Sequence, residues 1–273
     1  MDLISSKPTL IHMNTLAEIQ EKVRNAKELD FGDVFSHCIE LFKKVWVQGL
    51  LLQLFTVIVM LPIIIILYIP LIGMMMASSS GGYYDPSELE AFFAGFSLIY
   101  IIFILAGIIV LGAVAFALKA GFFRIVKKLD HGEDVTTSEF FYFLKGKHLQ
   151  KALVLVLISA AIGFVAITLC VLPIFYVMVP MAFFGVFYAF DPELTVGDMV
   201  SAGFALGNKK WLLVFGLMIV IGMILWLLSY ITCGIGNLFL AAFMHLPVYI
   251  IYKEIIGFGD TSEIDYIGLI ETF

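Results

Sequence analysis

Charged residues are scarce in this chain: only 14% of its 273 residues are Asp, Glu, Lys or Arg, against about 25% in an average soluble domain. Three cysteines are too few for a disulfide framework, and a formal net charge of −6 argues against a nucleic-acid partner. No HExxH, GxSxG, CxxC or Walker A motif is present, and we expect no catalytic residue, metal or cofactor. Apolar residues are in excess, at 62%, which indicates an integral membrane protein.

Long apolar segments predict how often the chain crosses the bilayer. A hydrocarbon core about 30 Å thick needs about 20 apolar residues of helix. Six segments without an ionised side chain meet this condition: Val47–Ile69, Ala91–Leu118, Ala152–Leu172, Ile174–Phe190, Trp211–Ile231 and Ile235–Tyr252. We therefore expect an all-α polytopic fold with six transmembrane helices, kinked at Pro180 and Pro247 in the two shortest.

The distribution of cations predicts the orientation of these spans. With six spans and a cytoplasmic N-terminus, every Lys and Arg falls on the cytoplasmic side, and the three outer connections carry none. Positively charged connections are retained inside the cell. We expect both termini in the cytoplasm, with the chain in the bacterial cytoplasmic (inner) membrane and in contact with its lipid.

Polar segments before the first, third and fifth spans share one pattern. Each starts with a helix-capping side chain that is followed three residues later by an acid: Asp30 and Asp33, Thr136 and Glu139, Thr195 and Asp198. Apolar residues of helical period follow, most clearly from Phe31 to Phe42. We expect three amphipathic helices in the membrane plane, with their apolar stripes in the acyl boundary. The interface residues beside them would be Lys43, Lys44, Trp46, Lys209, Lys210 and Trp211.

This pattern predicts a threefold internal repeat in which each unit is an in-plane helix, an outgoing span and a returning span. The repeats would cover about 30–118, 136–190 and 195–258 within a membrane domain of residues 30–258. Residues 1–29 and 259–273 would be cytoplasmic segments. The alternative is that the three polar segments are ordinary juxtamembrane helices with ordinary caps.

Three features occur together over about residues 28–258: the segment Lys43-Lys44-Val-Trp46, the successive span hairpins, and the run Ile231-Thr-Cys-Gly-Ile-Gly236 before a span that contains Pro247. In this combination the chain resembles a group of six-span bacterial integral membrane proteins that are similar to the membrane domain of glycerophosphoryl diester phosphodiesterases. The catalytic domain of those enzymes is absent here, so the resemblance implies a fold but no catalytic residue.

A few polar residues inside the spans are candidates for a site. His245 is either a proton relay or ligand contact, or a neutral imidazole bonded to a neighbouring helix, and we favour the second because no intramembrane charge is available as its partner. Asn237 and Gln53 could join it in an intramembrane polar site. Cys170 and Cys233 both approach the outer side and form either a disulfide or two small apolar contacts. The glycines before Lys209 and Lys210 favour close helix packing over phosphate binding.

These observations favour a non-enzymatic integral membrane scaffold or accessory subunit of a membrane protein complex, with other integral membrane proteins as partners. The alternative function is a transporter or carrier of lipid or another small apolar molecule. An enzyme would need an interfacial site built from His148, Glu139 or Asp198, and nothing in the sequence indicates that these residues converge.

Overall fold

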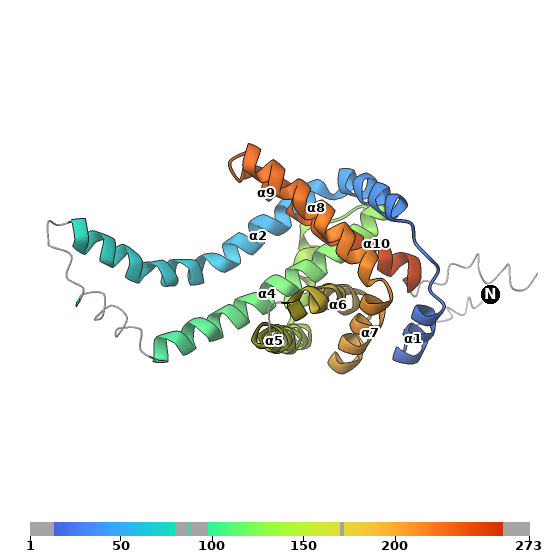
Figure 1. The fold of residues 1–273 in the computed structure, drawn as a ribbon, viewed down its shortest axis with the longest axis horizontal. Helices are drawn as coiled ribbons and strands as arrows, with labels where there is room; N and C mark the ends of the chain where they lie inside the picture. The colour runs from blue at the N-terminus through green and yellow to red at the C-terminus, as the bar shows by residue number, and fades with distance from the viewer. Residues whose placement is uncertain (1–13, 80–86, 88–97, 170–171, 259–273) are drawn as a thin grey trace, which may run out of the picture.

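The computed structural model describes residues 14–79, 87, 98–169 and 172–258 (Figure 1). Cys170, the start of the second predicted span at 91–97 and the predicted terminal segment 259–273 lie outside the described residues. Within them, all regular structure is helical. The helices are α1 (Leu16–Arg24), α2 (Phe31–Ser79), α4 (Leu98–Asp130), the 3-10 helix η1 (Thr137–Leu144), α5 (Gly146–Thr168), α6 (Leu172–Phe190), α7 (Val196–Lys209), α8 (Trp211–Ile231), α9 (Ile235–Leu240), the 3-10 helix η2 (Ala241–His245) and α10 (Leu246–Ile255).

Six helical segments are long and apolar enough to cross a membrane, which confirms the predicted all-helical class and the predicted number of apolar spans. Five are single helices or parts of one, and the sixth, Ile235–Ile255, comprises α9, η2 and α10. The last span therefore changes from α-helix to 3-10 helix and back. The change comes just before Pro247, which lacks an N–H and so opens the sixth segment's final α-helix.

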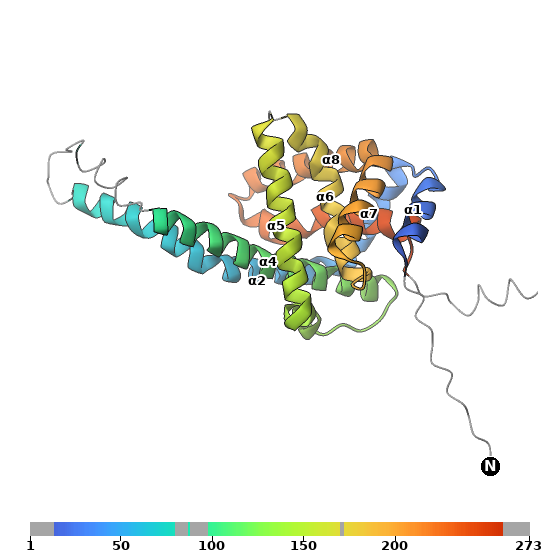
Figure 2. The ribbon, with the colours of Figure 1, turned by 90° about the horizontal axis from the view of Figure 1, so that it is seen from below.

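Helices α2 and α4 form a hairpin that extends away from the rest of the molecule in both views (Figures 1 and 2). The two helices approach closely at Gly107, where a Cβ atom would lie 2.8 Å from Cδ1 of Ile63. Helix α5 is seen end-on in Figure 1 and along its length in Figure 2, so it runs at a steep angle to this hairpin. The apolar hairpins thus leave the body of the molecule in different directions.

The core lies where α6 and α10 meet the C-terminal half of α4. In the most apolar stretch of α6 56% of the residues are buried, and in the last span 50%, whereas the other four spans reach 11–22%. Large aromatic side chains fill this core. Those without exposed surface include Phe122, Phe140, Phe143, Phe183, Phe184, Phe187, Tyr188, Tyr249 and Tyr252.

The first predicted in-plane helix is not separate from its span, because α2 runs without interruption from Phe31 to Ser79. No helix-breaking residue lies between Phe42 and Val47, and lysines are good helix formers. The expected position of the apolar stripe in the acyl boundary is also wrong for most of the helix. Val34 and Cys38 are buried in the protein core, and Phe42 packs on Phe243 of η2 with ring centroids 5.2 Å apart.

The second predicted helix start is also different from the structure. Residues Thr137–Leu144 form a 3-10 helix, and the side chain of Thr136 makes no capping hydrogen bond. Glu139 pairs instead with Lys128 of α4, at 2.6 Å between Oε1 and Nζ. The backbone of Phe140 lies against Gly121 of α4, where a Cβ atom would be 2.6 Å from its carbonyl oxygen. Tertiary packing on α4 therefore overrides the local capping signal.

At the other two predicted helix starts the side chains cap as their spacing suggests. Thr195 accepts a hydrogen bond from the Asp198 N–H, and the Asp198 carboxylate accepts one from the Thr195 N–H. Oδ1 of Asp30 accepts from the backbone N–H groups of Gly32 and Asp33. The three polar segments are thus an uninterrupted helix, a 3-10 helix and a separate capped α-helix.

The crossing of α6 and α7 depends on two glycines. A Cβ atom at Gly207 would lie 2.6 Å from the Pro180 Cα atom, and one at Gly203 would lie 2.6 Å from the Phe184 ring. The backbone of α7 consequently rests directly on the proline turn of α6. This is the close packing expected of these glycines, and it makes the α6–α7 contact intolerant of added side-chain atoms.

We predict that Gly207→Ala destabilises the protein by about 1–3 kcal/mol, because the new methyl group meets backbone atoms of Pro180 that cannot rotate away. Gly163→Ala in α5 is the matched control, since nothing lies within 4 Å of the added atom and a helical Gly→Ala change is otherwise favourable by about 0.5–1 kcal/mol. Thermal unfolding in detergent measures both. Equal unfolding midpoints for the two variants would contradict the close α6–α7 packing.

Candidate functional site

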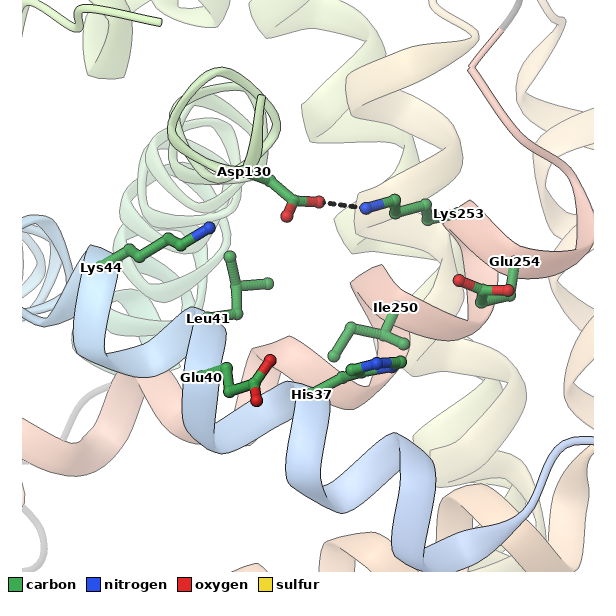
Figure 3. Close-up of a pocket in the computed structure, with 8 residues that line it drawn as sticks. All are labelled: His37, Glu40, Leu41, Lys44, Asp130, Ile250, Lys253 and Glu254. Atoms are coloured by element: carbon green, nitrogen blue, oxygen red, sulfur yellow. Dashed lines mark hydrogen bonds and ion pairs between the residues drawn. The ribbon is translucent and has the colours of Figure 1, made fainter. Parts of the chain in front are cut away.

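A polar cleft of about 220 Å³ lies between the first turns of α2, the end of α4 and helix α10 (Figure 3). Helix α2 directs three polar side chains into it because they are spaced at helical period on its polar face. The lining residues are His37, Glu40, Leu41 and Lys44 from α2, Asp130 from α4, and Ile250, Lys253 and Glu254 from α10.

Asp130 is the anchor of this cleft. It is the last residue of α4, and a carboxylate at the carboxyl end of a helix is disfavoured by the helix dipole unless it has partners. Oδ2 of Asp130 accepts hydrogen bonds from Lys253 Nζ at 2.6 Å and from the Tyr249 hydroxyl at 3.0 Å. Lys44 extends toward Asp130 from the opposite wall (Figure 3). The pair Asp130–Lys253 therefore joins α4 to α10 across the cleft.

A second cleft of about 210 Å³ continues the first, because both are lined by His37, Ile250 and Glu254. The segment between α1 and α2 forms its other wall, and Lys27 in that segment pairs with Glu254 at 2.6 Å. Among the described residues no group of three His, Cys, Asp or Glu side chains is arranged to hold a metal ion. The chemistry that these clefts offer is ion pairing with a charged segment.

A buried network fixes the N-terminal part of the chain to this region. The Asp191 carboxylate accepts hydrogen bonds from Asn14 Nδ2 at 2.9 Å and from the Tyr252 hydroxyl at 2.5 Å. Lys22 of α1 donates to Asn14 Oδ1 and to the Ile256 carbonyl, each at 2.8 Å. The network therefore ties α1 to the ends of α6 and α10, and Ile19 and Val23 of α1 are buried against the core.

Burial raises the pKa of the Asp191 carboxyl above its ordinary value of 3.8. The hydrogen bonds from Tyr252 and Asn14 and the charge of Lys22 act in the opposite direction, but they do not outweigh the loss of hydration. The ionised form of Asp191 is thus held inside the protein at a cost, and its three polar neighbours reduce that cost.

The predicted interface residues divide into two groups. Lys43 and Lys44 are exposed, and Trp46 keeps 44% of its surface exposed. Lys209 and Lys210 instead donate to the carbonyl oxygens of Arg24 and Lys27, so they hold the segment after α1. Trp211 donates from Nε1 to the Tyr176 carbonyl and stacks on Phe215. Burial and the neighbouring Lys209 lower the pKa of the Lys210 ammonium.

The predicted intramembrane polar residues lie in different surroundings. His245 ends η2 and packs edge-on against the rings of Phe122 and Phe123, whereas Asn237 of α9 is exposed. No hydrogen bond joins His245, Asn237 and Gln53 within the part of the chain that the structure describes. Cys233 is exposed at a position with φ of 52°, and the two alternatives for it, a disulfide with Cys170 or an apolar contact, stay open because Cys170 lies outside the described residues.

Residues that the sequence does not single out carry much of the polar structure. Asp130, Asp191 and Asn14 are the main ones. Asp191 directly follows Phe190, the last residue of an apolar run, whereas Asp130 lies beyond the run that ends at Leu118 and has no such signal. Helix α1 also has a signal in the sequence. Thr15 and Glu18 form a reciprocal capping box at its start.

No protein family, curated protein or solved structure matches this chain. The resemblance to the membrane domain of glycerophosphoryl diester phosphodiesterases stays a prediction from the sequence.

The raised pKa of Asp191 predicts a pH-dependent contribution to stability. Because the folded state binds the proton more tightly, this contribution is full below about pH 4 and is lost as the pH rises through the folded-state pKa. Asp191→Asn is neutral throughout, so its stability should rise relative to wild type as the pH is raised from about 4 to 7. Thermal unfolding across this range measures the difference.

Asp134→Asn, which changes an exposed acid, is the matched control and should follow wild type at every pH. A constant difference between Asp191→Asn and wild type would show that burial does not govern the protonation of Asp191. A difference that falls with pH would show that its hydrogen bonds dominate instead.

Proposed function

We propose that the chain is a non-enzymatic integral membrane scaffold or accessory subunit that associates with other membrane proteins through its α2/α4 hairpin. The observation that supports this most directly is the projection of that hairpin from the body of the molecule (Figures 1 and 2). Only 11% and 17% of the residues are buried in the most apolar stretches of the two helices, although they pack on each other.

The outward faces of the hairpin carry large apolar side chains and little that could bind a polar ligand. Ile58 and Phe103 are each about three-fifths exposed, at 60% and 59%. Thr56 directs its hydroxyl to the Leu52 carbonyl of its own helix. Such a surface offers van der Waals contact to lipid or to other spans, and it is long enough to accept a partner helix along its length.

The polar clefts at the base of the hairpin complement this surface. Their lining includes the exposed Lys44 and Glu40, which are positioned to pair with charges on a partner's inner segment. We place this end of the molecule in the cytoplasm, with both termini on the same side and the membrane being the bacterial cytoplasmic one. The helix pairs α2/α4, α5/α6 and α8 with the last span would then be the three hairpins of the proposed repeat.

The second candidate function is the carriage of a lipid or another small apolar molecule, and one groove favours it. Between α5 and α6 lies an open apolar groove of about 340 Å³. It is lined by Ala161, Ile162, Val165, Ala166, Leu169, Pro173 and Val177. A groove of this chemistry accepts an acyl chain, but it contains no polar group that would select one ligand.

The scaffold proposal predicts that a shape change on the hairpin releases partners without affecting the fold. Ile58→Trp keeps an apolar, membrane-compatible side chain but prevents close approach of a neighbouring helix. A loss of about 1 kcal/mol or more in association would lower partner recovery about fivefold. Quantitative mass spectrometry of the protein purified in mild detergent measures this.

Met223→Trp on α8 is the matched control, because Met223 is 66% exposed but lies outside the hairpin. It should leave partner recovery unchanged. A wild-type protein that purifies without stoichiometric partners, or equal losses in the two variants, would contradict the proposal.

The proposed orientation predicts the sidedness of two single-cysteine variants built on a chain in which Cys38, Cys170 and Cys233 are serine. Met75→Cys lies near the far end of α2, where Met75 is 71% exposed, and should react with a membrane-impermeant maleimide in intact spheroplasts. Lys147→Cys, at an exposed position near the start of α5, should react only after lysis. The reverse pattern would overturn the orientation.

A further inference from the structure

Lys119 is half-buried in the second half of α4, although its place in the sequence suggests a connection between spans. Its stem passes beside Gly185 of α6, where a Cβ atom would lie 3.1 Å from Lys119 Cε and 3.3 Å from Phe123. The absence of a side chain at Gly185 therefore makes the room that Lys119 occupies. The ammonium lies 5.3 Å from the centroid of the Phe116 ring.

The other basic group at this place is His245. Its ring lies edge-on to Phe122 and Phe123 at centroid distances of 6.5 and 6.2 Å, and it is close enough to Lys119 for the two to interact electrostatically. Both side chains are half-buried, so each keeps some accessible surface. Two nitrogen groups from α4 and η2 thus share one largely aromatic environment.

Neither group has an oxygen partner among the described residues, since no hydrogen bond or ion pair involves Lys119 or His245. This distinguishes Lys119 from the other half-buried lysines for which partners are described. Lys128 and Lys253 pair with carboxylates, and Lys151 donates to the Pro192 and Leu194 carbonyls. The fold supplies oxygens to those three cations and omits them at Lys119.

An ammonium removed from water needs an anion or several dipoles to offset its lost hydration. The ring of Phe116 contributes about 0.5–2 kcal/mol by cation–π attraction, which is only part of that cost. Lys119 directly follows the apolar run that ends at Leu118. In the proposed orientation, this is the depth of the headgroups of the inner leaflet, where basic sites between helices bind anionic lipids.

We propose that Lys119 and His245 form a binding site for the anionic group of an amphiphile, a phosphate or a carboxylate attached to an apolar chain. Lys119 supplies the charge, His245 donates a second hydrogen bond, and the surrounding phenylalanines contact the apolar chain. The depth of the site rests on the proposed orientation, whereas the binding itself does not depend on the scaffold function or on any partner protein.

Native mass spectrometry of the full chain in a zwitterionic detergent tests the proposal with three probes: dioleoyl phosphatidylglycerol, oleate and inorganic phosphate. Wild type should bind at least one of the two amphiphiles, and Lys119→Met should bind it about tenfold more weakly. Lys147→Met is the control: it removes an exposed cation from a different helix, α5, and should bind the amphiphile as wild type does. Phosphatidylglycerol alone would identify a lipid phosphate, and oleate alone a carboxylate.

Thermal unfolding provides a readout that a merely structural lysine would not change. The bound amphiphile should raise the unfolding midpoint of wild type and of Lys147→Met but not that of Lys119→Met. If Lys119→Met does not fold, photolabelling of wild type with a diazirine analogue of the bound probe decides, with crosslinks expected near Lys119 and His245.

The proposal is overturned by any of three results. These are no amphiphile binding by wild type, equal binding by wild type and Lys119→Met, or binding of inorganic phosphate without either amphiphile. None of them bears on partner recovery with Ile58→Trp, so failure of this proposal and failure of the scaffold proposal are distinguishable.

Discussion

The C-terminal half of α6 is the element on which the packing of the core depends, because α4, α7 and α10 all contact this helix. Its phenylalanines fill the core between α4, α7 and α10, and its proline turn supports the backbone of α7 at Gly207. The Tyr188 hydroxyl, near its end, donates to the carbonyl of His148 and so fixes the start of α5. Asp191, directly after the helix, accepts hydrogen bonds from Asn14, which lies just before α1, and from Tyr252 of α10. In lipid, helices gain little from burying apolar surface against one another, so tight packing and a few polar contacts of this kind must determine the arrangement.

The apolar character and number of the spans follow from the sequence because length and hydropathy alone decide them. Local capping is also predictable where nothing competes with it, as at Thr195 and Asp198. It fails at Glu139, because Lys128 lies one short segment away on a neighbouring helix and attracts the carboxylate more strongly than the helix start does. The continuity of α2 is a similar case. An in-plane helix is separated from the following span only where a helix-breaking residue interrupts the helix. No such residue lies just before Trp46, so α2 is continuous there.

The polar clusters are less predictable, since they depend on which helix ends meet in space. Asp130 and Asp191 resemble ordinary residues of connections when only the apolar runs are counted. Both become structural because α4 continues past the apolar run to Asp130 and because α10 brings tyrosines to both carboxylates. The environment of His245 depends on the same extension of α4. The sequence suggests that no charge is near this histidine, whereas the longer helix places Lys119 beside it.

A consequence of this arrangement is that the polar contacts and the exposed apolar surface lie in different parts of the molecule. At the base, described cations such as Lys22, Lys151 and Lys253 donate to protein oxygens, which makes that end rigid and specific in shape. In the projecting hairpin, side chains such as Ile58 meet no protein at all over most of their surface, and their contacts must come from the surroundings. A protein built in this way gains little from chemistry at the hairpin. The hairpin presents a fixed apolar shape, and in the body Lys119 and Lys44 are among the described cations for which no ion pair is formed.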